Sequence, residues 1–156
     1  MRSIHQWLED YGADHQNKTN KRIHWICVPL IVWSLLALLW SAPFPFAAQL
    51  GDMPLNWAVL LFVAGSLYYW FLSWRLALGI IIFNAVLLSI CAWIEMNAGW
   101  PLWAVALTVF VLAWIGQFIG HHIEGRKPSF FQDLQFLMIG PAWVISYFYR
   151  RVGLSF

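Results

Sequence analysis

Five histidines are the side chains best suited to chemistry, and they are unevenly placed along the chain. Three lie in or beside a polar N-terminal segment, and the other two end a long apolar stretch. They are His5, His15, His24, His121 and His122. Neutral imidazole suits iron, zinc, copper and nickel, so histidines that are distant in sequence could together hold a metal ion. Taken singly, each could instead be a solvated side chain or complement the dipole of a helix end.

Polar residues accompany the histidines at helical spacing. Gln117, His121 and Glu124 are four and three residues apart, so they share one face of a helix. Asn20 and His24 are likewise four residues apart, provided that their helix begins early. Each set could form one wall of a pocket, whose candidate catalytic groups are Asn20, Gln117 and Glu124. The carboxylate of Glu124 could also complete a metal site or orient a ligating imidazole.

The number and placement of ligating residues limit the kind of metal site. His122 points about 100° away from His121 on a helix, so the two need not serve the same centre. Cys27 and Cys91 both lie inside apolar stretches, which argues against a disulfide and against a thiolate zinc site. Five histidines are too few for the di-iron centres of membrane desaturases and hydroxylases. The candidate ligands of a mononuclear site are His15, His24, His121 and His122.

The elements that must position these groups are long and uncharged. The chain of 156 residues is 62% hydrophobic and 10% charged, whereas soluble domains are about 45–50% apolar and about 25% charged. No Asp, Glu, Lys or Arg occurs in residues 23–51, 53–74, 76–94 or 96–123. Each of these runs is long enough for a transmembrane helix, which needs about 20 residues.

The predicted fold is an all-α, polytopic helical membrane protein that forms one domain over residues 1–156. A polar segment, residues 1–23, lies at the cytoplasmic interface. Pro- and Gly-containing loops separate four spans, near residues 25–41, 55–74, 76–95 and 101–121. A C-terminal element, residues 134–149, is shorter and contains Pro141, so it could be a short span, a re-entrant hairpin or an interfacial helix. A fifth crossing would carry Arg150 and Arg151 outside, which favours a hairpin or an interfacial helix.

Lysines and arginines in the loops predict the orientation, because positive residues are retained on the cytoplasmic side. They precede the first span, mark the turn at Arg75 and follow the fourth span, whereas the loops at residues 42–56 and 95–100 have none. The N-terminus and the metal site should therefore face the cytoplasm, at the inner (plasma) membrane in a bacterium. The net charge of +2 is too small to indicate nucleic-acid binding. Nothing in the sequence indicates an oligomer.

Three segments resemble a known family. They are HQNKTNKRIHWICVPL at residues 15–30, WIGQFIGHHIEGRKPS at 114–129 and DLQFLMIGP at 133–141. The paired patterns H-x4-N-x3-H-x4-P-L and Q-F-I-G-H…E-G-R-K-P are specific, and the resemblance spans nearly the whole chain. The family is that of membrane-bound, Fe(II)-dependent 2-hydroxy fatty acid dioxygenases.

The resemblance implies α-oxidation, in which O2 attacks a 2-hydroxy fatty acid at an iron centre and the chain is released one carbon shorter. His15, Asn20 and His24 match the first pattern. The residues that match the second are Gln117, His121, Glu124, Gly125, Arg126, Lys127 and Pro128. Three histidines would hold Fe(II), and the partners would be a fatty-acyl lipid and O2. Arg126 and Lys127 could pair with the substrate carboxylate at the interface, although both also suit the role of topology-setting charges.

Two other classes of function are consistent with the same residues. A b-haem electron carrier would use His24 and His121 as axial ligands from two spans. A transporter or a purely structural membrane protein would carry its histidines incidentally. No ionisable residue lies in the middle of a span, where coupling-ion sites of transporters usually have one, which argues against transport.

Overall fold

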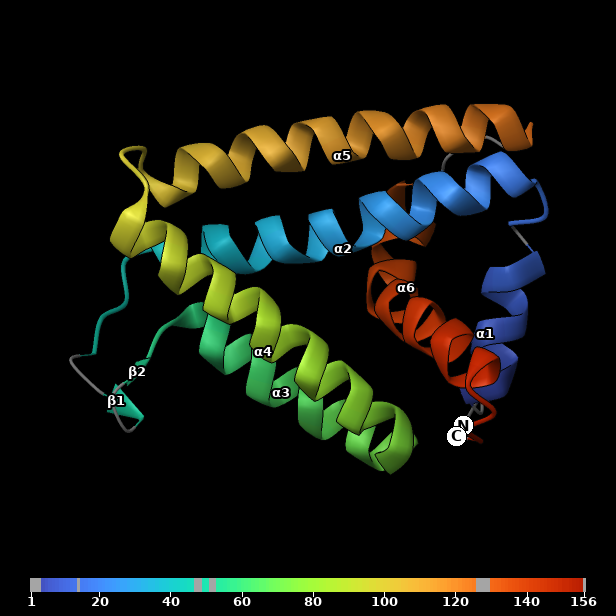
Figure 1. Ribbon diagram of the computed structural model, residues 1–156, viewed down its shortest axis with the longest axis horizontal. Coiled ribbons are helices and arrows are strands. Elements are labelled where there is room, and N and C mark those ends of the chain that lie inside the picture. The colour runs from blue at the N-terminus through green and yellow to red at the C-terminus, as the bar shows by residue number, and fades with distance from the viewer. Residues whose placement is uncertain (1–3, 14, 47–48, 51–52, 126–129, 156) are drawn as a thin grey trace.

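The computed structural model describes residues 4–13, 15–46, 49–50, 53–125 and 130–155. Most of these residues are helical, as predicted (Figure 1). The helices are α1 Ile4–Ala13, α2 Lys18–Ser41, α3 Trp57–Leu72, α4 Trp74–Asn97, α5 Leu102–Glu124 and α6 Phe130–Arg151. Two short strands, β1 Gln49–Leu50 and β2 Met53–Pro54, pair antiparallel between α2 and α3.

The start of α2 is fixed by a side-chain cap. Asn17 precedes the helix, and its side-chain oxygen accepts the backbone N–H groups of Thr19 and Asn20, which have no partner inside the helix. The helix therefore begins at Lys18, well before the predicted span at residue 25. This early start places Asn20 and His24 one turn apart on the same helix.

Three of the four predicted spans are confirmed as helices long and apolar enough to cross a membrane. They are α2, α4 and α5, with 24, 24 and 23 residues. Helix α3 has 16 residues and is therefore about 24 Å long, against about 30 Å for the hydrocarbon core of a bilayer. Within the described residues, α3 is thus an apolar helix shorter than a typical span.

The C-terminal element is one helix, so the prediction of a re-entrant hairpin is wrong. Helix α6 runs without interruption from Phe130 to Arg151 and includes Pro141, extending beyond the predicted residues 134–149. It packs against α1, α2 and α4. Ile139 and Ala142 of α6 are fully buried in a cluster with residues of α1 and α4. These contacts supply the packing that keeps the helix continuous through a proline.

The helices are arranged as two pairs and an end group (Figure 1). Helices α2 and α5 lie side by side and antiparallel, and α3 and α4 form a second antiparallel pair inclined to them. Helices α1 and α6 lie together at the end where α2 begins and α5 finishes. The two pairs share a core that contains four fully buried small residues, Ala37, Ala58, Cys91 and Ala106. Small residues allow close approach of helix backbones.

The contact between α2 and α5 is especially close at two glycines. A Cβ atom on Gly116 would lie 2.6 Å from Cys27 Sγ, and one on Gly120 would overlap Asn20 Oδ1. The spacing G-x-x-x-G is typical of closely packed membrane helices, because it removes side chains from the contact face. The two helices that carry His24 and His121 thus pack together with almost no side-chain volume between them.

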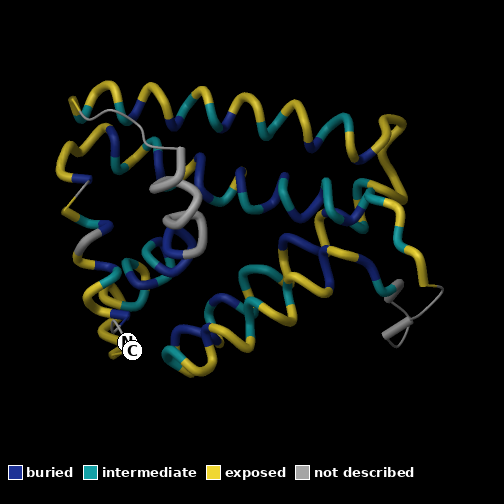
Figure 2. The backbone as a smooth tube through the Cα atoms, turned by 180° about the vertical axis from the view of Figure 1, so that it is seen from behind, coloured by how far each residue is buried: buried dark blue, intermediate teal, exposed yellow. Residues whose placement is uncertain are grey.

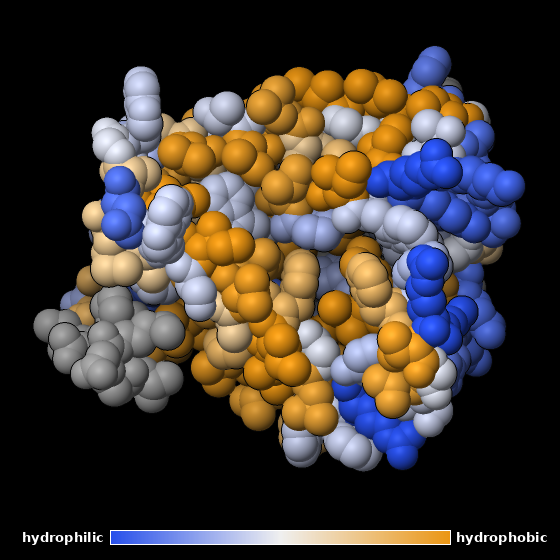
Figure 3. Space-filling model, in the orientation of Figure 1, coloured by the Kyte–Doolittle hydropathy of each residue, from blue (hydrophilic) through white to orange (hydrophobic). Residues whose placement is uncertain are grey.

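The outward faces of the long helices are apolar. Figure 2 shows exposed positions along the outer faces of α3, α4 and α5. Figure 3 shows hydrophobic residues over the middle of the visible face and hydrophilic ones at the end where α1 and α6 lie. On α5 the exposed large side chains include Leu107, Val111, Leu112, Ile115 and Ile119. Such a continuous apolar surface fits contact with lipid rather than with water. The three long apolar helices therefore fit an integral membrane protein.

Candidate metal centre

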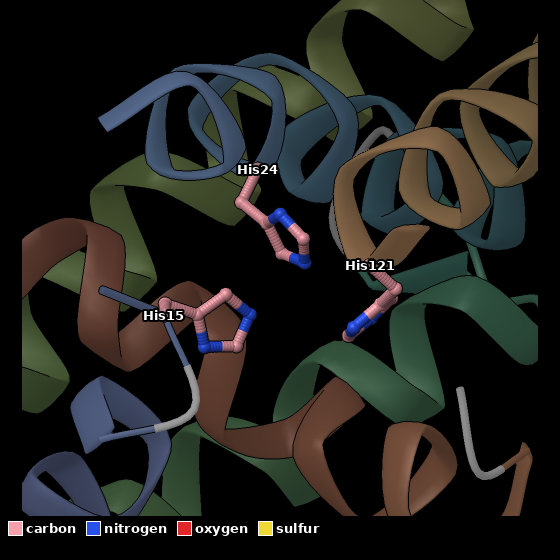
Figure 4. Close-up of side chains that lie close together, drawn as sticks. All are labelled: His15, His24 and His121. Carbon is pink, nitrogen blue, oxygen red and sulfur yellow. The ribbon is translucent and has the colours of Figure 1, made fainter. Parts of the chain in front are cut away.

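Three histidines from separate parts of the chain meet at the end of the α2–α5 pair. His15 lies between α1 and α2, His24 lies on α2, and His121 lies on the last turn of α5 (Figure 4). One ligating nitrogen from each ring lies within 4.8 Å of the others. The rings of His15 and His24 are 2% and 1% exposed. The structure thus gathers three of the four predicted ligands around one point.

Hydrogen bonds fix which ring nitrogens face that point. His15 Nδ1 lies 2.6 Å from the carbonyl oxygen of Tyr11, and His24 Nδ1 lies 3.0 Å from that of Asn20. A carbonyl oxygen only accepts, so each Nδ1 must carry the proton and each Nε2 must carry a lone pair. His15 Nε2 is buried and has no hydrogen-bond partner among the described residues. A buried acceptor without a donor is costly in a protein interior, and a metal ion would satisfy it.

The electrostatic surroundings keep the His15 ring neutral. Burial lowers the pKa of His15 below its ordinary value of 6.5, and the neighbouring His121 lowers it further, against a hydrogen bond to Tyr11 that raises it. At pH 7 the ring therefore needs no deprotonation before it can bind a metal. The His15 ring is therefore ready to bind a cation in the protonation state that the fold imposes.

The spacing suits a single ion. Metal–imidazole bonds are about 2.1 Å long, so three such nitrogens around one ion lie roughly 3–3.5 Å apart. The observed limit of 4.8 Å is close enough for small ring rotations to close the site. A b-haem would need only two axial histidines, whereas three imidazoles converge here. The geometry therefore favours a mononuclear site over the haem alternative.

The Glu124 carboxylate ties the segment that carries His15 to the end of α5. It accepts the Gln16 N–H at 2.8 Å and the Asn17 N–H at 3.1 Å. The Asn20 side chain donates to the same carboxylate from Nδ2, at 2.7 Å. Two of these donors are backbone N–H groups next to His15, so Glu124 holds the backbone that carries this ligand.

A family model described as 2-hydroxy-palmitic acid dioxygenase Mpo1-like matches residues 1–152. The chain belongs to this family. The match confirms the resemblance drawn from the sequence, and it includes every residue of the histidine cluster. No curated protein and no solved structure matches the chain.

Replacement of Glu124 by alanine should weaken metal binding by about 10- to 100-fold, the usual effect of losing a group that orients a ligand. The loss of three accepted hydrogen bonds frees the His15 segment from α5. The matched control is Glu95→Ala, which removes the acceptor of the 2.6 Å bond from Trp40 Nε1 at the other end of α2. Titration of each purified variant with Fe(II) would measure the difference. Equal metal affinity for Glu124→Ala and wild type would contradict the positioning role.

The remaining predicted site residues of the Mpo1-like chain lie in different places. Gln117 is 7% exposed, lies one turn before His121, and its Oε1 has no partner within the described parts of the chain. His122 is exposed and does not join the cluster of three. Arg126 and Lys127 lie outside the described residues.

Two aromatic residues beside the cluster were not anticipated from the sequence. Tyr11 stacks on His15 with ring centroids 4.3 Å apart, and Trp143 lies 5.8 Å from the same ring. The four-residue spacing of Tyr11 and His15 is a weak signal, because helix α1 ends at Ala13, before His15. Trp143 comes from α6, and no local pattern links it to the first helix of this Mpo1-like chain.

Proposed function

We propose that the chain is a membrane-bound dioxygenase that uses Fe(II) and O2 to shorten 2-hydroxy fatty acids by one carbon. The observation that carries this proposal is the convergence of His15, His24 and His121 on one buried point. Membership of the dioxygenase-like family supports the substrate class, and the long apolar helices suit an acyl substrate that is dissolved in a bilayer.

Some residues of the site would bind the metal, and others would position the residues that bind it. The three imidazoles of the cluster would hold Fe(II), a metal that this type of ligand suits. Fe(II), when bound, would supply the redox chemistry that activates O2. Asn20 and Glu124 would hold the His15 segment in place through their mutual hydrogen bond. Gln117 would offer its unpaired amide oxygen on the same helix as His121.

The overall reaction balances without any other reductant. It is R–CH(OH)–COOH + O2 → R–COOH + CO2 + H2O. The bond between the carboxyl carbon and the hydroxyl-bearing carbon breaks, the latter carbon becomes the new carboxyl group, and the original carboxyl carbon leaves as CO2. The two carbons together lose four electrons, and O2 accepts them as it is reduced.

The helix arrangement supports four crossings in one membrane domain, with the site on the cytoplasmic side. Trp40 near the end of α2 donates to Glu95 near the end of α4, so these two ends lie together. Helix α4 begins at Trp74, one helix length away from Glu95. Only Ser73 separates this start from the end of α3. Helix α3 must therefore carry the chain from the level where α2 ends to the level where α4 begins. Lys18 and Lys21 at the start of α2 support a cytoplasmic location for this end of the bundle, because positive residues are retained on that side.

Labelled substrate tests the proposed reaction. The protein is purified without metal, loaded with Fe(II) and given 2-hydroxypalmitate that carries 13C at the carboxyl carbon. The proposal predicts one 13CO2 and one unlabelled C15 acid for each O2 consumed, and no product under anaerobic conditions. Oxygen uptake without 13CO2, or no O2 uptake by the iron-loaded protein, would refute it.

A further inference from the structure

A groove lies beside the histidine cluster, between α1, the first part of α2 and the last part of α6. Its volume is about 450 Å3, within the range of about 300–1,000 Å3 that is usual for small-molecule sites. The lining includes Lys21 and Trp25 of α2 and Trp143, Tyr147 and Arg150 of α6. None of these residues belongs to the three-histidine cluster.

The groove reaches the edge of the metal centre. Trp143 lines the groove, and its ring lies 5.8 Å from the His15 ring. Gln16 also lines it and donates its backbone N–H to Glu124. A molecule in the groove would therefore have one end next to the histidines.

The lining combines positive charge with an aromatic wall. Lys21 and Arg150 contribute two positive charges, against the single carboxylate of Glu9. Trp25 and Tyr147 face each other across the contact of α2 and α6, with ring centroids 4.3 Å apart. A cationic side chain can pair with the carboxylate of a fatty acid. Aromatic rings can pack against the methylene groups that follow this carboxylate.

We propose that this groove binds the carboxyl end of the fatty-acyl substrate, with Lys21 as the residue that pairs with the carboxylate. The proposal rests on the proposed function and adds a substrate-binding residue to it. The acyl chain leaves along Trp25 and Tyr147 towards the bilayer, and the carbon that bears the hydroxyl group lies on the side of Trp143 and His15. The sequence pointed instead to Arg126 and Lys127 for this pairing.

Direct binding to the iron-loaded protein under anaerobic conditions tests Lys21 without any turnover. The probes are 2-hydroxypalmitate and its uncharged analogue 2-hydroxypalmitamide, in vesicles of zwitterionic lipid. We expect Lys21→Gln to weaken binding of the acid about tenfold, as for the loss of one charge-assisted hydrogen bond, and to leave amide binding unchanged. Lys21→Arg should restore most of the preference for the acid. The matched control is Lys18→Gln, which removes an exposed lysine from the same turn but not from the groove.

The outcomes separate this proposal from others. Unchanged acid binding by Lys21→Gln overturns the proposal, and so does equal weakening of acid and amide. An anionic phospholipid headgroup shares the chemistry of a carboxylate. If Lys21→Gln affects binding only in vesicles that contain phosphatidylglycerol, Lys21 binds lipid and the proposal is wrong. Failure of the dioxygenase proposal would appear separately, as binding of the acid without consumption of O2 once air is admitted.

Discussion

Alanine at His15, His24 or His121 is expected to abolish tight metal binding and, with it, oxygen-dependent turnover. Each substitution removes one of three ligating nitrogens that lie within 4.8 Å of one another. The loss should exceed the roughly 100-fold upper range for removal of a group that merely orients a ligand. Metal content after desalting and O2 uptake with 2-hydroxypalmitate measure the two effects.

Two other histidines provide matched controls for these variants. His5 and His122 are both exposed, and neither belongs to the cluster. His5→Ala and His122→Ala should therefore bind metal as the wild type does. Because His15 and His24 are buried, the helix content of each variant should also be measured by circular dichroism. A well-folded His24→Ala variant with full metal content would contradict the ligand assignment, as would loss of metal from His122→Ala.

Alanine at Gly120 is expected to disturb both the α2–α5 contact and the metal centre. The added Cβ would overlap Asn20 Oδ1 and would lie 3.3 Å from His24 Cε1. Asn20 cannot simply swing away, because its amide donates to Glu124 at 2.7 Å. Overpacking of a tight contact costs about 1–3 kcal/mol. We expect a lower thermal unfolding midpoint and weaker metal binding in the same variant.

The control for Gly120→Ala is Gly65→Ala. Gly65 lies inside α3, and a Cβ there would meet nothing within 4 Å. Alanine favours a helix over glycine by about 1 kcal/mol, so this variant should unfold at the same or a higher temperature. Thermal unfolding in detergent, followed by circular dichroism, compares the two. If Gly120→Ala is as stable and binds metal as well as Gly65→Ala, the close contact is not needed to position the site.

The cluster was largely predictable because its members obey local rules. The four-residue spacing of Asn20 and His24 and of Gln117 and His121 is meaningful on any helix, and the long uncharged runs indicate where those helices lie. The positive-inside pattern then predicts that both helix ends lie at one membrane face. His15 could be added because it lies close to the start of the first helix. The family resemblance followed from the same residues, and the family match confirms it.

Other features depended on backbone and tertiary contacts that leave no such pattern. The donors to Glu124 are two backbone N–H groups and one amide, and a backbone group has no signature in the sequence. The approach of Trp143 to His15 depends on how α6 packs, and the continuity of α6 through Pro141 depends on its contacts with α1 and α4. The G-x-x-x-G spacing of Gly116 and Gly120 is visible in the sequence, but the sequence does not show that Gly120 lies against Asn20.

X-ray absorption at the iron edge of the Fe(II)-loaded protein tests the central claim most directly. Scattering from imidazole rings counts the histidines bound to the metal and gives their bond lengths. We predict three imidazoles per iron at about 2.1 Å in the wild type, an unchanged spectrum for His122→Ala and fewer imidazoles for His121→Ala. Iron surrounded by oxygen atoms alone, or an imidazole count that falls in His122→Ala and not in His121→Ala, would contradict a site made of His15, His24 and His121.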